Sequence, residues 1–191
     1  MKPRSSTPPN EVRIIGGQWK RTRLAVLDKP GLRPTPDRVR ETLFNWLGQD
    51  LTGWRCVDAF AGTGALGFEA ASRGAANVLM IEQDPQLVDR LRATQEKLQA
   101  SAVRVERGNA VTALSRLAPG SVDLVLLDPP FDSNLWDKIL QSSQQALSEQ
   151  GMLYLEGPQP WTDEKLAPVG LVLVRHMKAG AVHAHLLRRT A

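Results

Sequence analysis

Asp58-Ala-Phe-Ala-Gly-Thr-Gly-Ala-Leu-Gly67 is the stretch that decides the fold, because its three glycines come directly after an apolar run. The run over 55–60 is typical of a buried strand, and a helical pattern follows over 65–73. Glycines at this G-x-G-x-x-G spacing form the tight turn between strand and helix in nucleotide-binding α/β folds. The spacing alone is not specific, since any such turn favours glycine, and Gly67 could serve only close packing of the helix.

The rest of the chain repeats this alternation of strand and helix. Strand-like runs cover 55–60, 77–82, 102–106, 121–127 and 151–156, and helical patterns cover 65–73, 85–100, 109–117 and 134–148. Such alternation predicts an α/β fold with a parallel sheet and helices on both faces. Two last strand-like runs, over 169–176 and 181–187, are joined by a link too short for a parallel crossover, so we expect the sheet to end in an antiparallel hairpin.

Two carboxylates near the glycine turn indicate which ligand it binds. Glu82 ends the next strand 20 residues after Gly62, the position of an acid that binds ribose hydroxyls. Asp58 ends the first strand, where it would repel a pyrophosphate but could pair with a cationic amino-acid group. Glu82 would suit either ligand, but Asp58 and the tetrapeptide over 128–131 favour S-adenosylmethionine, a nucleoside with a cationic amino-acid tail, over a dinucleotide. Asn109, followed by Ala110, would lie against the adenine, although Asn109 could equally cap a helix. The predicted cofactor site comprises Asp58, Phe60, Ala61, Gly62, Thr63, Gly64, Glu82, Asn109 and Ala110.

A second constellation, Asp128-Pro-Pro-Phe131, follows the apolar run over 122–127. It would lie at the C-terminal end of a strand, where open α/β sheets bind ligands. Proline has a fixed φ, so Pro129 holds the nearby carbonyl groups in a set direction. A carboxylate and fixed carbonyls are acceptors that suit an amino group with two N–H donors, and the ring of Phe131 could stack on a flat heterocycle. The alternative is a strand-ending turn with a surface aspartate and a packed ring. The predicted catalytic set is Asp128, Pro129, Pro130 and Phe131.

Positive charge is concentrated at both ends of the chain. Residues 1–40 hold ten Lys and Arg against three Asp and Glu, and residues 175–191 hold four and none. The body between them is acidic, with ten basic and seventeen acidic residues. Basic segments of this kind indicate a polyanionic partner, although a solvated basic tail is common.

The N-terminal part is expected to be organised separately from the sheet. Residues 1–10 have the composition of a disordered lead, and two short strand-like runs then predict a β-hairpin. A linker rich in proline and glycine over 30–37 leads into a helix from Asp37 to about Leu47. We therefore expect a basic lead over 1–10, a hairpin and linker over 11–36 that binds the polyanion, and a catalytic domain over 37–191. The candidates for phosphate contacts are Lys20, Arg21, Arg23, Arg33, Arg38 and Arg40. Arg38 and Arg40 lie two apart and cannot share one helix face, so at least one of them could serve the structure or the cofactor instead.

The composition excludes several classes of protein. The single cysteine, Cys56, allows no disulfide within the chain and lies in a strand-like run, as a buried thiol would. The three histidines do not have the spacing of metal ligands, and no metal site is expected. No run of 18 apolar residues is present, and the polar first ten residues do not form a signal segment, so a cytoplasmic protein is expected.

Four segments resemble the bacterial RsmD family of methyltransferases. They are Arg13-Ile-Ile-Gly-Gly-Gln-Trp-Lys20, the block over 32–47, the glycine turn over 58–67 and the tetrapeptide over 128–131. The block over 32–47 is the most specific of the four, and the family often has threonine where this chain has Pro36. The resemblance implies a seven-stranded methyltransferase sheet and S-adenosylmethionine as the cofactor. It also implies methylation of a guanine 2-amino group in 16S ribosomal RNA, within a partly assembled small subunit.

Two rival functions remain open at the level of the sequence. The tetrapeptide does not distinguish guanine from adenine or cytosine, so an amino-group methyltransferase of DNA uses the same signal. The glycine turn alone would also suit an NAD-dependent oxidoreductase. The particular guanine, the assembly state of the RNA substrate and the oligomeric state of the protein cannot be inferred from the sequence.

Overall fold

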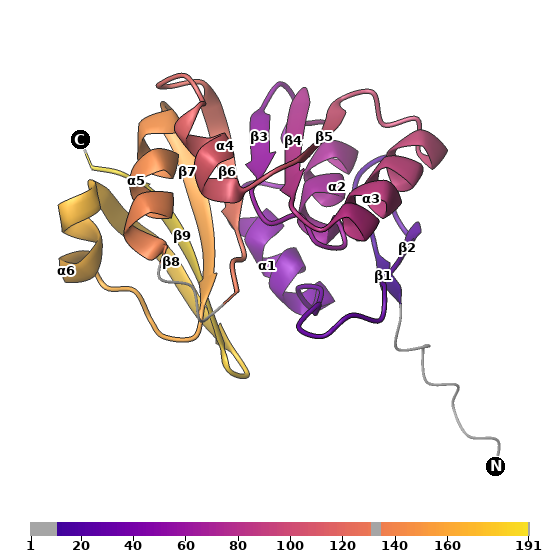
Figure 1. Ribbon diagram of the computed structural model, residues 1–191. Helices are drawn as coiled ribbons and strands as arrows, with labels where there is room; N and C mark the ends of the chain where they lie inside the picture. The colour runs from indigo at the N-terminus through magenta and orange to yellow at the C-terminus, as the bar shows by residue number, and fades with distance from the viewer. Residues whose placement is uncertain (1–10, 131–134, 191) are drawn as a thin grey trace, which may run out of the picture.

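The computed structural model describes residues 11–130 and 135–190, so the expected lead over 1–10 and Phe131 lie outside the described residues. Its main feature is a seven-stranded sheet in the order β5-β4-β3-β6-β7-β9-β8 (Figure 1). The strands are β3 (Arg55–Asp58), β4 (Asn77–Glu82), β5 (Val103–Arg107), β6 (Val122–Leu127), β7 (Leu147–Gly157), β8 (Leu171–Ala179) and β9 (Val182–Arg189). The first five strands are parallel, and β9 pairs antiparallel with both β7 and β8. The prediction of a parallel sheet that ends in an antiparallel hairpin is therefore confirmed.

The helices cover both faces of this sheet. They are α1 (Asp37–Trp46), α2 (Ala65–Ser72), α3 (Pro85–Lys97), α4 (Ala110–Ser115), α5 (Trp136–Ala146) and α6 (Asp163–Leu166), followed by a short 3₁₀ turn over Ala167–Val169. Buried side chains of α1, α2 and α3 share one hydrophobic cluster with one face of the sheet, and those of α4, α5 and α6 share a second cluster with the other face. None of the helices in the described part of the chain is long and apolar enough to span a membrane.

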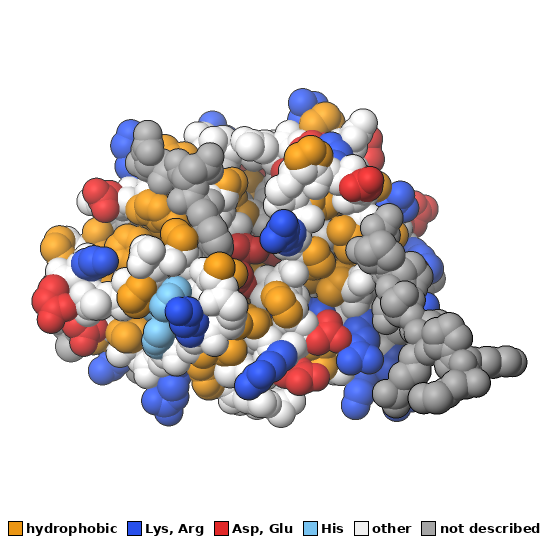
Figure 2. All heavy atoms as spheres, turned by 90° about the horizontal axis from the view of Figure 1, so that it is seen from below, with side chains coloured by type: hydrophobic (Ala, Val, Ile, Leu, Met, Phe, Trp, Pro, Cys, Tyr) orange, Lys and Arg blue, Asp and Glu red, His pale blue; other side chains and the backbone are white. Residues whose placement is uncertain are grey.

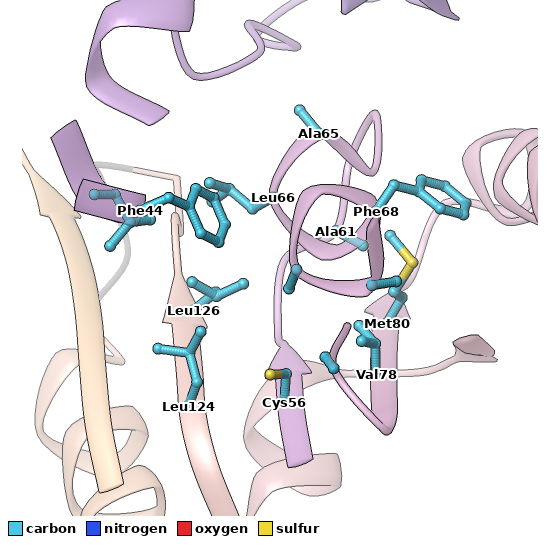
Figure 3. Packing of buried hydrophobic residues seen from close by; sticks show 14 of the residues in the cluster. Phe44, Cys56, Ala61, Ala65, Leu66, Phe68, Val78, Met80, Leu124 and Leu126 are labelled. Carbon is cyan, nitrogen blue, oxygen red and sulfur yellow. The ribbon is translucent and has the colours of Figure 1, made fainter. Parts of the chain in front are cut away.

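Side chains that alternate along the strands build the first cluster. Cys56 on β3 and Leu124 and Leu126 on β6 share this cluster with Phe44 of α1 and Leu66 of α2, and Figure 3 shows Leu126 beside the Phe44 ring and Leu66. Cys56 is buried as expected, and its burial raises the pKa of the thiol to about 12. A thiol that stays protonated in a packed core serves as a small apolar side chain.

Local signals set the start of α3 and limit α5. The side chain of Asp84 accepts hydrogen bonds from the N–H groups of Gln86 and Leu87, and Pro85 occupies the first helical turn. The helix expected over 134–148 ends at Ala146, because Leu147 is already extended and pairs with Val122. β7 therefore begins four residues earlier than the strand expected over 151–156.

The N-terminal hairpin consists of β1 (Glu11–Arg13) and β2 (Arg23–Ala25), which pair antiparallel as expected. It packs on α1 and α2 and contributes Val12, Ile14 and Leu24 to the first hydrophobic cluster. Trp19 in its connection is partly buried against the same cluster, which favours a packing role for this ring.

A buried ionic network fastens the hairpin to the helices. The carboxylate of Glu69 on α2 accepts hydrogen bonds from the N–H groups of Ile15 and Gly16, each at 2.8 Å. The same carboxylate pairs with Arg73 at 2.9 Å and with Arg40 of α1 at 3.3 Å. Glu69 and Arg40 are fully buried, so this paired carboxylate holds two helices and the hairpin together.

Candidate active site

The parallel strands end at one edge of the sheet, and a pocket of about 970 Å³ opens there. Its walls come from the glycine turn after β3, the ends of β4, β6 and β7, the linker over 30–36 and the β8–β9 connection. Seen from below the view of Figure 1, the surface is hollowed, and acidic side chains lie in the hollow among hydrophobic ones (Figure 2). Open α/β sheets bind ligands at this edge, so the pocket is the candidate active site.

The glycine turn has a backbone that only glycine adopts without strain. Gly62 and Gly64 have φ angles of 53° and 81°, in the left-handed region. A Cβ atom on Gly64 would lie 2.6 Å from the ring of Phe68 and 2.7 Å from Leu91, so the turn also needs a small residue. A Cβ on Gly67 would lie 2.7 Å from the Cε of Met80, which supports the packing role considered for this glycine.

Asp58 lies at the bottom of the pocket and organises the start of α2. Its Oδ2 accepts a hydrogen bond of 2.9 Å from the N–H of Gly67, and only 2% of the residue is exposed. Burial raises the pKa of this carboxyl to about 7, against hydrogen bonds from Gly67 and Phe60 that lower it. Burial disfavours the charged form of this carboxyl, and a nearby cation would favour it. Asp58 therefore suits the ammonium group of a ligand.

Glu82 connects the end of β4 to the glycine turn. Its Oε2 accepts from the N–H of Gly62 at 3.0 Å, and its Oε1 accepts from the N–H of Asp84 at 2.9 Å. Each oxygen keeps a second lone pair, and the side chain lines the pocket. The carboxylate is therefore held in place where two neighbouring hydroxyl groups of a ribose could donate to it.

Asn109 caps α4, one of the two roles considered for it. Its Oδ1 accepts from the N–H of Thr112 at 3.2 Å, and Asn109 and Ala110 both line the pocket. All the predicted cofactor residues except Gly64 thus line one pocket, Phe60, Ala61 and Thr63 among them.

The acids of the pocket wall agree with the ligand that the sequence favours. Its described lining contains four acidic side chains and one basic one, Arg33. The acidic side chains are Asp58, Glu82, Asp128 and Glu156. A lining of this charge suits a nucleoside with a cationic amino-acid tail and disfavours a pyrophosphate. S-adenosylmethionine therefore fits the residues present, with Asp58 toward its amino-acid part and Glu82 toward its ribose.

Asp128, Pro129 and Pro130 line the pocket directly beyond β6. Burial raises the pKa of Asp128 well above its ordinary value, and the negative charges of Glu156 and Asp58 raise it further. A carboxylate in this position has a strong tendency to take up a proton or to accept a hydrogen bond from an N–H group.

Thr35 and Glu156 also belong to this wall, although neither is among the site residues predicted from the sequence. Glu156 lies near the end of β7, beside Asp128, and accepts a hydrogen bond of 2.8 Å from the hydroxyl of Thr35 in the linker. Glu156 occupies the same kind of position, the C-terminal end of a strand, that singled out Asp58 and Asp128, so this signal could have identified it. Nothing in the composition of the linker indicated that Thr35 would reach into the site.

The basic candidates divide into exposed residues and one buried residue. Lys20, Arg21 and Arg23 are exposed on the hairpin, and Arg33 and Arg38 are exposed on the linker and α1. The prediction that Arg40 contacts phosphate is wrong, because Arg40 is fully buried. Its guanidinium donates to the carbonyl oxygens of Thr35 and Arg13 and pairs with Asp37 at 2.6 Å, so it serves the structure. Within the described ranges, no cluster of three or more His, Cys, Asp or Glu side chains could hold a metal ion.

The sheet order, the glycine turn and the acids at the strand ends define this protein as one with the methyltransferase fold. The family described as "Conserved hypothetical protein 95" matches residues 12–188, and the chain belongs to this family, the RsmD family that its motifs resemble. Ribosomal RNA small subunit methyltransferase D of Escherichia coli K12 is 38% identical over 193 residues, which cover 100% of this chain and 96% of the relative.

Two further proteins extend this similarity. The relative of the same name from Haemophilus influenzae is 38% identical over 178 residues, which cover 86% of this chain and 92% of the relative. The solved structure of yhhF from Escherichia coli superposes with a TM-score of 0.81 at 36% identity, covering 95% of this chain and 99% of that one. The similarity in sequence and in fold therefore extends over almost the whole chain.

Proposed function

We propose that this protein transfers a methyl group from S-adenosylmethionine to the 2-amino group of a guanine in 16S ribosomal RNA. The observation that carries the proposal is the placement of Asp128-Pro129-Pro130 in one pocket with the glycine turn, Asp58 and Glu82. The named relatives, ribosomal RNA small subunit methyltransferases, support RNA of the small subunit as the substrate. We further propose that the protein acts in the cytoplasm on a partly assembled small subunit.

The acidic lining counts against the rival oxidoreductase. A dinucleotide would place its pyrophosphate at the glycine turn, beside Asp58, where repulsion would weaken binding. S-adenosylmethionine carries no phosphate and supplies a methyl group that is already activated by the positive sulfur. The pocket needs only to bind the cofactor, orient the acceptor amino group and exclude water.

Asp128 and the carbonyl of Pro129 orient the acceptor nitrogen in this proposal. The guanine amino group is a poor nucleophile, since its lone pair is delocalised into the ring. Hydrogen bonds from its two N–H groups to these acceptors direct the lone pair toward the methyl carbon and raise its electron density. Bound S-adenosylmethionine would supply the methyl group to this nitrogen, and its sulfur would keep the electron pair of the S–C bond. The nitrogen then gives up one proton to the carboxylate of Asp128 or to water.

The target base must leave its stack to reach this pocket, and Phe131 is proposed to stack on it. The exposed cations of the hairpin and linker would hold the flanking RNA by its phosphates. These proposed contacts are Lys20, Arg21, Arg23, Arg33 and Arg38.

Methyl incorporation with the Asp128→Ala variant tests the proposed function. The wild-type protein should methylate 16S RNA at a guanine that mass mapping finds unmodified in cells lacking the protein. Asp128→Ala should lower kcat by at least about 100-fold, the scale of a lost contact to the reacting group, while titration shows unchanged affinity for S-adenosylmethionine. Incorporation into DNA alone, or full turnover by the variant, would contradict the proposal.

A further inference from the structure

Glu156 is a buried carboxylate of the pocket for which the proposed methyl transfer provides no role. It is 4% exposed and lines the pocket near the end of β7. β7 pairs in parallel with β6, and Leu155 is the partner of Leu127. Asp128 and Glu156 therefore come directly after paired residues on neighbouring strands, which lie about 4.8 Å apart in a sheet.

The two carboxylates are near enough to affect each other. The charge of Glu156 is among the causes that raise the pKa of Asp128. Side chains alternate along a strand, so Glu156 points to the same face as Tyr154, the partner of Leu126. Asp128 follows Leu126 by two residues and shares that face. Both carboxylates can therefore meet one edge of a flat ligand.

Two hydroxyl groups hold the carboxylate of Glu156 by one of its oxygens. Thr35 and Tyr154 both donate to Oε1, each at 2.8 Å. Among the described residues, Oε2 accepts no hydrogen bond from a side chain or from the backbone, although the side chain is buried. Glu156 lines the pocket, and its Oε2 has no donor among the described residues, so this oxygen is available to accept a hydrogen bond from a ligand.

Two neighbouring carboxylates need a ligand edge that presents donors side by side. Guanine carries an N–H at ring position 1 directly beside its 2-amino group. Adenine and cytosine carry a ring nitrogen with a lone pair beside their amino groups, and this lone pair would face the second carboxylate. A site of two acceptors therefore fits guanine and repels the other two amino-bearing bases.

We propose that Glu156 accepts the N1–H of the target guanine through Oε2 while Asp128 accepts from the 2-amino group, and that Glu156 thereby selects guanine over adenine and cytosine. This inference rests on the proposed function and adds to it the residue that reads the base. Thr35 and Tyr154 are positioning residues, since their hydroxyls fix which oxygen of Glu156 faces the base. A purely structural Glu156 would anchor the linker through Thr35 without influencing base preference.

Base analogues at the target position test this assignment. 2-Aminopurine keeps the 2-amino group of guanine but has a lone pair at N1. Small subunits are reconstituted with 16S RNA that carries guanine or 2-aminopurine at the methylated position, and kcat/KM is measured for each. The wild-type protein should prefer guanine by about 100-fold, the scale of a hydrogen bond to a charged group.

Glu156→Gln isolates the contribution of this side chain. Thr35 and Tyr154 would keep the amide oxygen at the place of Oε1 and turn the amide NH₂ toward the base. This donor opposes the N1–H of guanine and matches the lone pair of 2-aminopurine. We expect the preference for guanine to fall by about 100-fold, with unchanged affinity for S-adenosylmethionine. Glu149→Gln, an exposed position on the same strand, is the matched control and should keep the wild-type preference.

The outcomes separate the two proposals. Equal turnover of guanine and 2-aminopurine by the wild-type protein would overturn the role of Glu156 and leave the methyltransferase function standing. An unchanged preference in Glu156→Gln would overturn it as well. Absence of methylation of either substrate by the wild-type protein would refute the proposed function, and the role of Glu156 would fall with it.

Discussion

Carboxylates that are buried or half-buried at adjacent strand ends give this pocket its chemical character. Asp58, Asp128 and Glu156 follow β3, β6 and β7 or lie near their ends, and burial raises the pKa of each. Protein atoms replace much of the water around them, so ligands that bring positive charge or N–H donors favour their ionisation. The cost of desolvating these acids without a ligand favours the binding of a cationic cofactor and a donor-rich base.

Asp58→Asn tests this cost through the pH dependence of stability. The pKa of Asp58 is about 7 in the folded protein and near its ordinary value of 3.8 when unfolded. The folded state therefore holds its proton more tightly, so the stability contributed by this group is complete below about pH 4 and is lost as the pH rises toward 7. Asparagine does not ionise, and its carbonyl can still accept from Gly67. The free energy of unfolding of Asp58→Asn relative to wild type should rise between pH 4.5 and pH 8 in urea titrations.

Asp58→Asn should bind the cofactor more weakly, although the substitution stabilises the folded protein at high pH. Loss of the negative charge should weaken the affinity for S-adenosylmethionine by about 10-fold at pH 8, the scale of one charged contact. Calorimetric titration measures this affinity in both proteins. A difference in stability that is the same at every pH would mean that the pKa of Asp58 is not raised by folding, and unchanged cofactor affinity would mean that Asp58 does not bind the cationic group.

Among the elements, the backbones of the hairpin and α2 lie so close together that no side chain fits between them at Gly17. The N–H of Gln18 donates to the carbonyl of Ser72 at 2.8 Å, and the hydroxyl of Ser72 donates to the carbonyl of Gly16 at 2.6 Å. Gly17 lies between these bonds with a φ of 73°. A Cβ at Gly17 would lie 1.9 Å from the carbonyl oxygen of Ser72, so only glycine allows this contact.

Gly17→Ala should therefore separate the hairpin from α2. Both the left-handed φ and the overlap with backbone destabilise the variant. Gly120→Ala is the matched control, because Gly120 has a φ of 69° and no atom within 4 Å of an added Cβ. We expect Gly17→Ala to lose about 2 kcal/mol more of the free energy of unfolding than the control. If urea unfolding shows the same loss of free energy of unfolding in both variants, the hairpin can move to accommodate the Cβ without a measurable loss of stability.

The sequence predicts elements well where the signal is local. The apolar runs and the glycine turn give the strands, the helices and the antiparallel end of the sheet within a few residues, because each depends on side-chain period and turn chemistry. The signal fails where partners lie far apart in the chain. Arg40 reads as an exposed cation, yet it is buried beside Glu69, 29 residues away. Thr35 reads as part of a linker, yet it donates to Glu156, 121 residues away.

Across the whole molecule, negative charge lines the pocket and positive charge lies on the hairpin and linker beside it. The linker over 30–36 forms part of the pocket wall and follows directly after the hairpin. Arg40 joins the carbonyls of Arg13 in the hairpin and Thr35 in the linker, so these segments are held in one arrangement. RNA bound by the hairpin would therefore lie at a fixed distance from the carboxylates proposed to bind the base.

Neutralising the exposed cations of the hairpin tests whether the hairpin, rather than the rest of the surface, binds the RNA phosphates. Lys20, Arg21 and Arg23 are exposed, so replacing all three by glutamine should leave folding intact and weaken binding to the small subunit. Each lost phosphate contact lowers the dependence of log K on log salt by about 0.7–0.9, so the slope should fall by about 2–3. The control replaces three exposed cations of α3 and β5, Arg90, Arg92 and Arg104, and changes the net charge equally. Binding titrations from 50 to 200 mM salt measure the slope of log K against log salt for both variants. If this slope falls equally in both, RNA binding depends on the total charge and not on the hairpin.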